Sequence, residues 1–91
     1  MTISVSHLFD MLRDIFHEWN ITLKEADITK FYKAKLFRVD FVYLKDNQLH
    51  ETVVVITFDE LLNTASVRGM GFDSVFVALM VQKLKEELNN E

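Results

Sequence analysis

The sequence predicts a single small α+β domain over residues 1–91, and three observations carry this fold class. Apolar residues recur at helical spacing at the start of the chain, alternate with polar residues in its middle, and return to helical spacing at its end. The chain is 49% apolar and 12% aromatic, which is the composition of a folded domain with one core. No repeat and no Pro- or Gly-rich linker divides it, so we expect one domain.

The first element is an amphipathic helix predicted over residues 5–19. Its apolar side chains recur at steps of three and four on one side: Val5, Leu8, Phe9, Leu12, Ile15, Phe16 and Trp19. Ser4 or Ser6 can act as the N-cap. A stripe this regular predicts that the helix packs on an apolar layer, most simply a sheet. Residues 20–35 fit neither period, and Thr22 and Glu25 have capping-box spacing, so we expect a turn or short helix running into a strand.

An antiparallel hairpin is predicted over residues 36–58. If Asp46 and Asn47 form a two-residue turn, Leu44 pairs with Leu49, Phe41 with Thr52, Val39 with Val54 and Phe37 with Ile56. This register gathers one apolar face: Phe37, Val39, Phe41, Tyr43, Val54, Ile56 and Phe58. The reverse face also carries valines and leucines, so we expect it to be partly covered. Two strands make a marginal sheet, so we expect a third strand from residues 21–34 or 64–68, or sheet extension across a dimer.

Two helices are predicted after the hairpin. Asp59 is a possible N-cap, the apolar residues from Phe58 to Ala65 have helical spacing, and Gly69 can follow the helix end, so we expect a short helix over residues 60–67. A strand through residues 65–68 is the alternative. A long helix then begins at Asp73 or Ser74, runs to about Leu88, and packs on the sheet.

The long helix carries two apolar stripes. One consists of Phe72, Val75, Phe76 and Leu79, and the second of Val77, Met80, Val81, Leu84 and Leu88. A surface helix on a small domain needs only one such stripe. We therefore expect the second stripe to bind a partner, so that Val81→Asp or Leu84→Asp gives a folded monomer. The alternative is a central helix whose stripes are both core.

These features predict a non-catalytic protein-interaction module, namely a small cytoplasmic modulator, adaptor or inhibitor that binds a protein partner or itself as a homodimer. The chain has no cysteine, which excludes disulfides and thiolate zinc sites. No nucleotide-binding spacing occurs, and nothing places a serine, a histidine and an acid together, so we expect neither an enzyme nor a cofactor.

A single-stranded nucleic-acid-binding module is the alternative function. Basic and aromatic residues interleave in one segment: Lys30, Phe31, Tyr32, Lys33, Lys35, Phe37 and Arg38. Cations neutralise phosphates and aromatic rings stack on bases, so this pattern fits single strands. The net charge of −4 argues against general nucleic-acid affinity, and a solvated strand edge is the simpler interpretation.

Weaker candidate sites also occur. His7, Asp10, Asp14 and His17 share one side of the first helix and could ligate a metal, but a solvated helix face explains them and we expect no metal. Arg68 to Gly71 could hold an anion before the last helix, or simply turn the chain. The longest apolar run, residues 75–81, is too short to span a membrane. Residues 1–6 lack the features of a secretory signal, so we expect a cytoplasmic location and no membrane partner.

Overall fold

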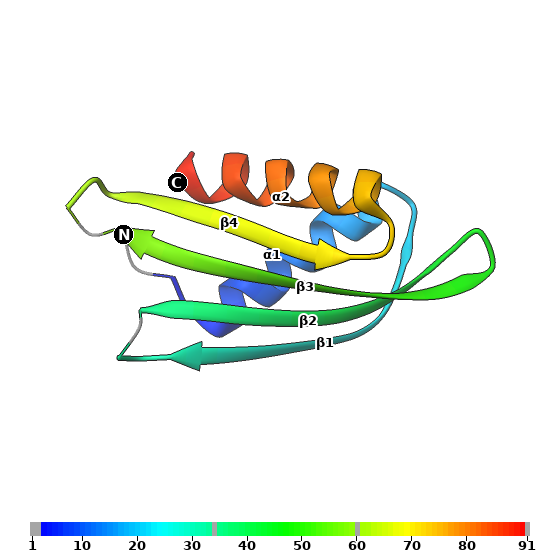
Figure 1. Ribbon diagram of the computed structural model, residues 1–91, viewed down its shortest axis with the longest axis horizontal. Helices are drawn as coiled ribbons and strands as arrows, with labels where there is room; N and C mark the ends of the chain where they lie inside the picture. The colour runs from blue at the N-terminus through cyan, green and yellow to red at the C-terminus, as the bar shows by residue number, and fades with distance from the viewer. Residues whose placement is uncertain (1–2, 34, 60, 91) are drawn as a thin grey trace.

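The computed structural model describes residues 3–33, 35–59 and 61–90, and its elements form an α+β fold (Figure 1). In chain order they are α1 (Val5–Glu18), β1 (Thr22–Phe31), β2 (Leu36–Lys45), β3 (Gln48–Asp59), β4 (Thr64–Gly71) and α2 (Ser74–Asn89). The strands form one antiparallel sheet in the order β1-β2-β3-β4. The predicted N-terminal helix, antiparallel hairpin and C-terminal helix are confirmed, and the sheet has two strands more than the hairpin.

Local signals fix the ends of α1. The helix begins after Ser4, whose side-chain oxygen accepts the backbone N–H of His7 at 3.0 Å, and it ends at Glu18, one residue before the predicted end. Its buried side chains are Leu8, Met11, Leu12, Ile15 and Phe16. Hydrophobic burial along this stripe is what holds α1 on the sheet.

The β2–β3 hairpin has the predicted register. Leu44 pairs with Leu49, Phe41 with Thr52, Val39 with Val54 and Phe37 with Ile56. The turn residues Asp46 and Asn47 have φ values of 53° and 62°, as a two-residue turn of the favoured hand requires. Because the side-chain period is two, this register places all the predicted core residues of the hairpin on one face.

Both segments proposed for a third strand are strands. Residues 22–31 form β1, whose pairing with β2 shifts at a bulge between Leu23 and Glu25. The expected short helix over residues 60–67 is wrong, because residues 64–71 form β4 and include the alternative strand. The described part of the β3–β4 connection is a turn in which a carboxylate oxygen of Asp59 accepts the N–H groups of Leu61 and Leu62.

Both helices cover the same face of the sheet. The ring of Phe16 from α1 lies 5.6 Å from that of Phe41, and the ring of Phe76 from α2 stacks on Tyr43 with centroids 4.2 Å apart. Aromatic contacts of this kind add to the free energy gained by burying the rings. The core therefore lies between one layer of two helices and one layer of four strands.

The reverse face of the sheet lies opposite both helices, so the expected partial covering is not provided by any element of the described residues. Val53 and Val55 are half-buried by their neighbours in the sheet, while Leu49 and Met70 are exposed. Among the described residues, no helix is long and apolar enough to cross a membrane.

Candidate interaction surface

The stripe predicted to bind a partner lies on the sheet side of α2. Met80, Leu84 and Leu88 are fully buried, Val77 is 8% exposed and Val81 is half-buried against the core. Their expected exposure in a single copy is therefore wrong. The physical reason is β4, because this extra strand provides the surface that the stripe covers.

Two glycines let α2 lie close to β4. A Cβ atom on Gly69 would lie 2.7 Å from Cγ1 of Val77 and 2.9 Å from Cγ2 of Val81. A Cβ atom on Gly71 would lie 2.8 Å from the hydroxyl oxygen of Thr52. Both glycines are strand residues, so the expectation that Gly69 follows the end of a short helix is wrong. Their lack of a side chain makes room for the valines of α2.

The exposed apolar surface of α2 is the other stripe, at the corner where β4 leads into the helix. Here Met70 is 70% exposed, Phe72 is fully exposed, and Val75 and Leu79 are 69% and 55% exposed. We call these four residues the corner strip. Met70 and Phe72 line one shallow hollow of about 480 Å³ with Val53, Gly71 and Glu51, and Val75 and Leu79 continue from Phe72 at steps of three and four.

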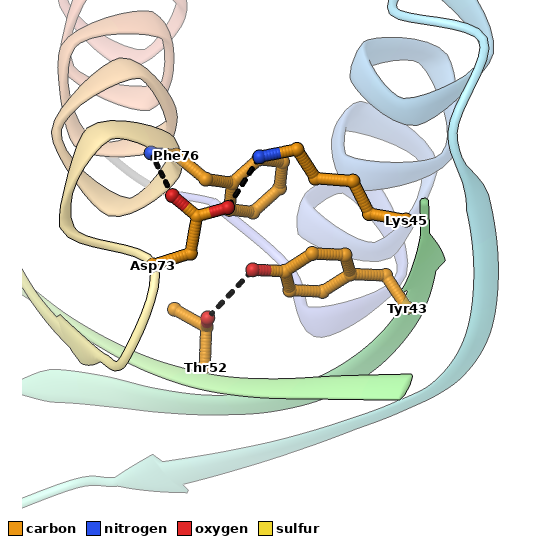
Figure 2. A network of polar contacts seen from close by, with 5 residues as sticks. All are labelled: Tyr43, Lys45, Thr52, Asp73 and Phe76. Carbon is orange, nitrogen blue, oxygen red and sulfur yellow. Dashed lines mark hydrogen bonds and ion pairs between the residues drawn. The ribbon is translucent and has the colours of Figure 1, made fainter. Parts of the chain in front are cut away.

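A polar network fixes the corner strip to the hairpin (Figure 2). Lys45, at the end of β2, forms an ion pair with Asp73, the N-cap of α2. The second carboxylate oxygen of Asp73 accepts the N–H of Phe76 at 3.1 Å. The hydrogen bond from Lys45 and that from Phe76 lower the pKa of Asp73, and the bond to Asp73 raises the pKa of Lys45. The acid that lies between Phe72 and Val75 in the chain is thus already paired.

Tyr43 lies beneath this ion pair. Its hydroxyl oxygen accepts a long hydrogen bond of 3.4 Å from the hydroxyl of Thr52, and the ring of His50 stacks on the Tyr43 ring at 5.3 Å. Burial raises the pKa of Tyr43 above its usual range. The titratable groups of this network therefore contact one another, and the network holds the first turn of α2 on the hairpin.

The metal-ligand candidates of α1 are divided between two shallow surface hollows. His7, Asp10 and Asp14 line one with Glu18 and Glu87, while His17 lines another, to which Asp14 also contributes. Lys83 neutralises the first, because its Nζ lies 3.4 Å from carboxylate oxygens of both Glu18 and Glu87. Over the described residues, no three histidine, aspartate or glutamate side chains are placed to hold a metal ion.

The basic and aromatic segment is also divided by the structure. Phe37 is buried in the core, and the Nε atom of Arg38 lies 3.0 Å from Asp40 on the reverse face. Lys30 lies over the rings of Tyr32 and Phe37, with 4.9 and 5.4 Å between its Nζ and the ring centroids. Phe31, Tyr32, Lys33 and Lys35 remain exposed near the β1–β2 turn.

The distribution of charge along α2 is a sequence signal for the corner strip. Phe72, Val75 and Leu79 were expected to face the core, and Met70 was not predicted as a site residue. Residues 74–82 contain no charged side chain, although four of the last nine residues of α2, Lys83, Lys85, Glu86 and Glu87, are charged. A charge-free stretch on a surface helix is typical of a contact surface.

Comparison with known proteins adds no functional information. A scan against protein-family models, a search of curated proteins and a search of solved structures each find no match. The functional conclusion therefore rests on the geometry of this chain alone.

Proposed function

We propose that this protein is a non-catalytic protein-interaction module whose corner strip packs against the same strip of a second copy. The observation that carries this proposal is the full exposure of Phe72, with exposed Met70 before it in β4 and exposed Val75 and Leu79 after it in α2. Burying a Val, Leu, Phe or Met side chain contributes about 1.5–3 kcal/mol each before the costs of association are subtracted. Four such side chains from each copy supply a useful association energy.

The absence of charge on the first half of α2 favours a second copy of the chain as the partner of the corner strip. The chain has a net charge of −4, so two copies repel each other over most of their surfaces. Residues 74–82 carry no charge, and Asp73 is neutralised by Lys45. The helical parts of two corner strips, Val75 and Leu79, can therefore meet without bringing charges of residues 73–82 into opposition, and Glu51 beside Met70 and Phe72 is the acid that a second copy must avoid.

The described polar groups support a non-catalytic role. Four titratable side chains near the start of α2, Lys45, Tyr43, His50 and Asp73, are engaged in the network that holds α2 on the hairpin. The hollows beside them are shallow, whereas binding of a small substrate needs a concave site with converging polar groups. A surface that binds another protein is the function that best fits this arrangement.

Light scattering on the purified chain tests the proposal. We expect the wild type to be a dimer at micromolar concentrations, and Val75→Asp and Leu79→Asp to be monomers with unchanged circular dichroism. Ala78→Asp is the matched control, because Ala78 is an exposed residue of the same helix outside the strip, and it should remain a dimer. A monomeric wild type, or a dimer that survives both substitutions in the strip, contradicts the proposal.

Single-stranded nucleic acid remains a second candidate ligand, and one observation favours it. Tyr32 is 77% exposed with Lys30 over its ring, which places a stacking platform beside a cation. Fluorescence anisotropy with single-stranded DNA and RNA at two salt concentrations tests it. Binding should weaken at the higher salt and be reduced by Tyr32→Ala. Absence of binding at low salt eliminates this candidate.

A further inference from the structure

One side chain of α2 binds the backbone of β4 as a neighbouring strand does. The N–H of Ala65 donates to the side-chain oxygen of Asn89 at 2.8 Å, and the side-chain nitrogen of Asn89 donates to the carbonyl oxygen of Ala65 at 3.1 Å. In an antiparallel sheet, two residues that form a hydrogen-bonded pair exchange the same two bonds, each N–H donating to the carbonyl oxygen of the other residue. The amide of Asn89 therefore occupies the place of a peptide group at this edge.

Further backbone groups along this edge point away from β3. Ala65 points its backbone groups away from β3, and hydrogen bonding alternates along an antiparallel strand, so Val67 and Gly69 point theirs the same way. In the sheet formed by the described residues, β4 is a terminal strand. The other terminal strand, β1, has a bulge between Leu23 and Glu25, and a bulge interrupts pairing.

The position of α2 determines what can bind this edge. Val77, Val81, Lys85 and Asn89 recur at steps of four, so they form one row along the helix. Val77 and Val81 lie against Gly69 and Asn89 reaches Ala65, which places α2 directly on β4. Paired strands lie about 4.8 Å apart, whereas packed helices need 8–10 Å. A second copy would bring its own α2 into the same space, so the edge suits a strand that carries no helix.

We propose that the free edge of β4 binds an extended, acidic peptide segment of a partner protein by strand addition, and that Asn89 closes one position of this edge in the unbound protein. Charge identifies the segment as acidic. Arg68, the only charged residue of β4, is exposed on the reverse face, and Lys85 lies in the row of α2 between Val81 and Asn89. An extended peptide points alternate side chains to the two faces, so carboxylates can meet both cations.

This edge and the corner strip are different surfaces. Strand addition uses backbone atoms of Ala65, Val67 and Gly69, while dimerisation of the corner strip uses side chains from Met70 to Leu79. Leu79→Asp should therefore abolish the dimer and leave peptide binding unchanged. The two proposals can fail independently.

The test uses a fluorescein-labelled peptide of sequence Val-Thr-Asp-Val-Thr-Asp-Val, whose two acids point to opposite faces when it is extended. We expect Asn89→Ala to bind it about tenfold more tightly than wild type, because the competing amide is gone; tenfold corresponds to about 1.4 kcal/mol. Asn90→Ala is the matched control, because Asn90 contributes a backbone N–H to the end of α2, and it should bind as wild type does. Two control peptides should bind weakly: one with lysine in place of aspartate, and one N-methylated at alternate amides.

Amide shifts of the wild-type protein test the location without any substitution. In a titration to millimolar peptide, the N–H signals of Val67 and Gly69 should shift most. Three results would each overturn the proposal: equal affinity of wild type and Asn89→Ala, affinity that N-methylation does not change, or shifts confined to residues away from β4. If Asn89→Ala does not fold, the titration of the wild type with the peptide decides whether the edge of β4 is the binding site.

Discussion

Lys45 and Asp73 are 28 positions apart in the sequence, and their ion pair joins the end of β2 to the first turn of α2. Asp73 also caps that turn through Phe76, so one carboxylate links the hairpin, the helix start and the corner strip. A change in its charge therefore changes how firmly α2 is held on the sheet.

The lowered pKa of Asp73 predicts that the folded protein loses stability in acid. Its pKa is lowered in the folded protein, so its contribution is complete above the ordinary aspartate pKa and disappears as pH falls through the lowered value. Lys45 has a raised pKa, so its contribution is complete below the ordinary lysine pKa and disappears as pH rises through the raised value. The free energy of unfolding of the wild type, measured in urea at a series of pH values, should therefore keep both contributions at neutral pH and lose that of Asp73 in acid.

Asp73→Asn is the variant that separates charge from capping. Asparagine still accepts the N–H of Phe76, but it has no charge for Lys45 and no acid titration. We expect this variant to be less stable than wild type at pH 7, and the difference to shrink as pH falls toward 2. A difference that stays constant over this range contradicts a role for the ion pair.

Gly69→Ala should lower the free energy of unfolding by about 1–3 kcal/mol, the usual cost of overpacking a core. The new methyl group would lie 2.7 Å from a methyl carbon of Val77 and 2.9 Å from one of Val81, so these neighbours would have to shift. Gly69→Ala/Val77→Ala should recover part of the loss, which a double-mutant cycle measures. Simple additivity of the two single substitutions would show that the contact is not what limits position 69.

Asn47→Val should destabilise the hairpin by about 1–2 kcal/mol, because a branched side chain is strained in the left-handed region. Asn47 has φ of 62° in the turn between β2 and β3. Asn47→Gly is the control, since glycine adopts this conformation without steric cost and should avoid that loss. Urea unfolding monitored by circular dichroism compares the three proteins, and equal losses for valine and glycine would exclude backbone strain as the cause.

Leu84 and Leu79 should respond differently to the same substitution. Leu84 is fully buried, so Leu84→Ala should cost about 2–5 kcal/mol of unfolding free energy. Leu79 is 55% exposed, so Leu79→Ala should change the stability of the isolated subunit by less than about 0.5 kcal/mol. Measurements at concentrations below dimer formation make the comparison clean. Similar losses at both positions would contradict the placement of the two stripes.

The features predictable from the sequence are those set by neighbouring residues. Two positive-φ residues in a two-residue turn determine the register of β2 and β3, and the register determines the core face of the hairpin. Ser4 and Asp73 identify the starts of both main helices, because a side-chain oxygen satisfies a free backbone N–H there.

The two outer strands were harder to predict because their alternation is disturbed. In β1 the bulge near Lys24 adds a residue, so Leu23 and Ala26 face the same side although they are three positions apart. In β4 the inward positions are Ala65, Val67, Gly69 and Gly71, which give little hydrophobic signal. The capping-box spacing of Thr22 and Glu25 and the apolar spacing from Phe58 to Ala65 then favoured helices.

The sequence predicts the wrong buried side of α2 because β4 is hard to recognise. With only a hairpin to cover, five large side chains exceeded the surface that the sequence accounted for. With β4 in the sheet, Met80, Leu84 and Leu88 become core and Phe72, Val75 and Leu79 face solvent. Which stripe of α2 is buried depends on the pairing of β4 with β3, and the spacing of apolar residues within the helix carries no information about that pairing.

The sequential strand order has a consequence for how the chain folds. Every strand pairs with the strand next to it in sequence, so the sheet can grow outward from the tight β2–β3 turn without closing a long loop. Such local pairing lowers the mean sequence separation of contacts, which favours rapid folding for a sheet of this size. The chain can therefore add its two terminal strands to a preformed hairpin, which shortens the interval in which unpaired strands are most prone to aggregate.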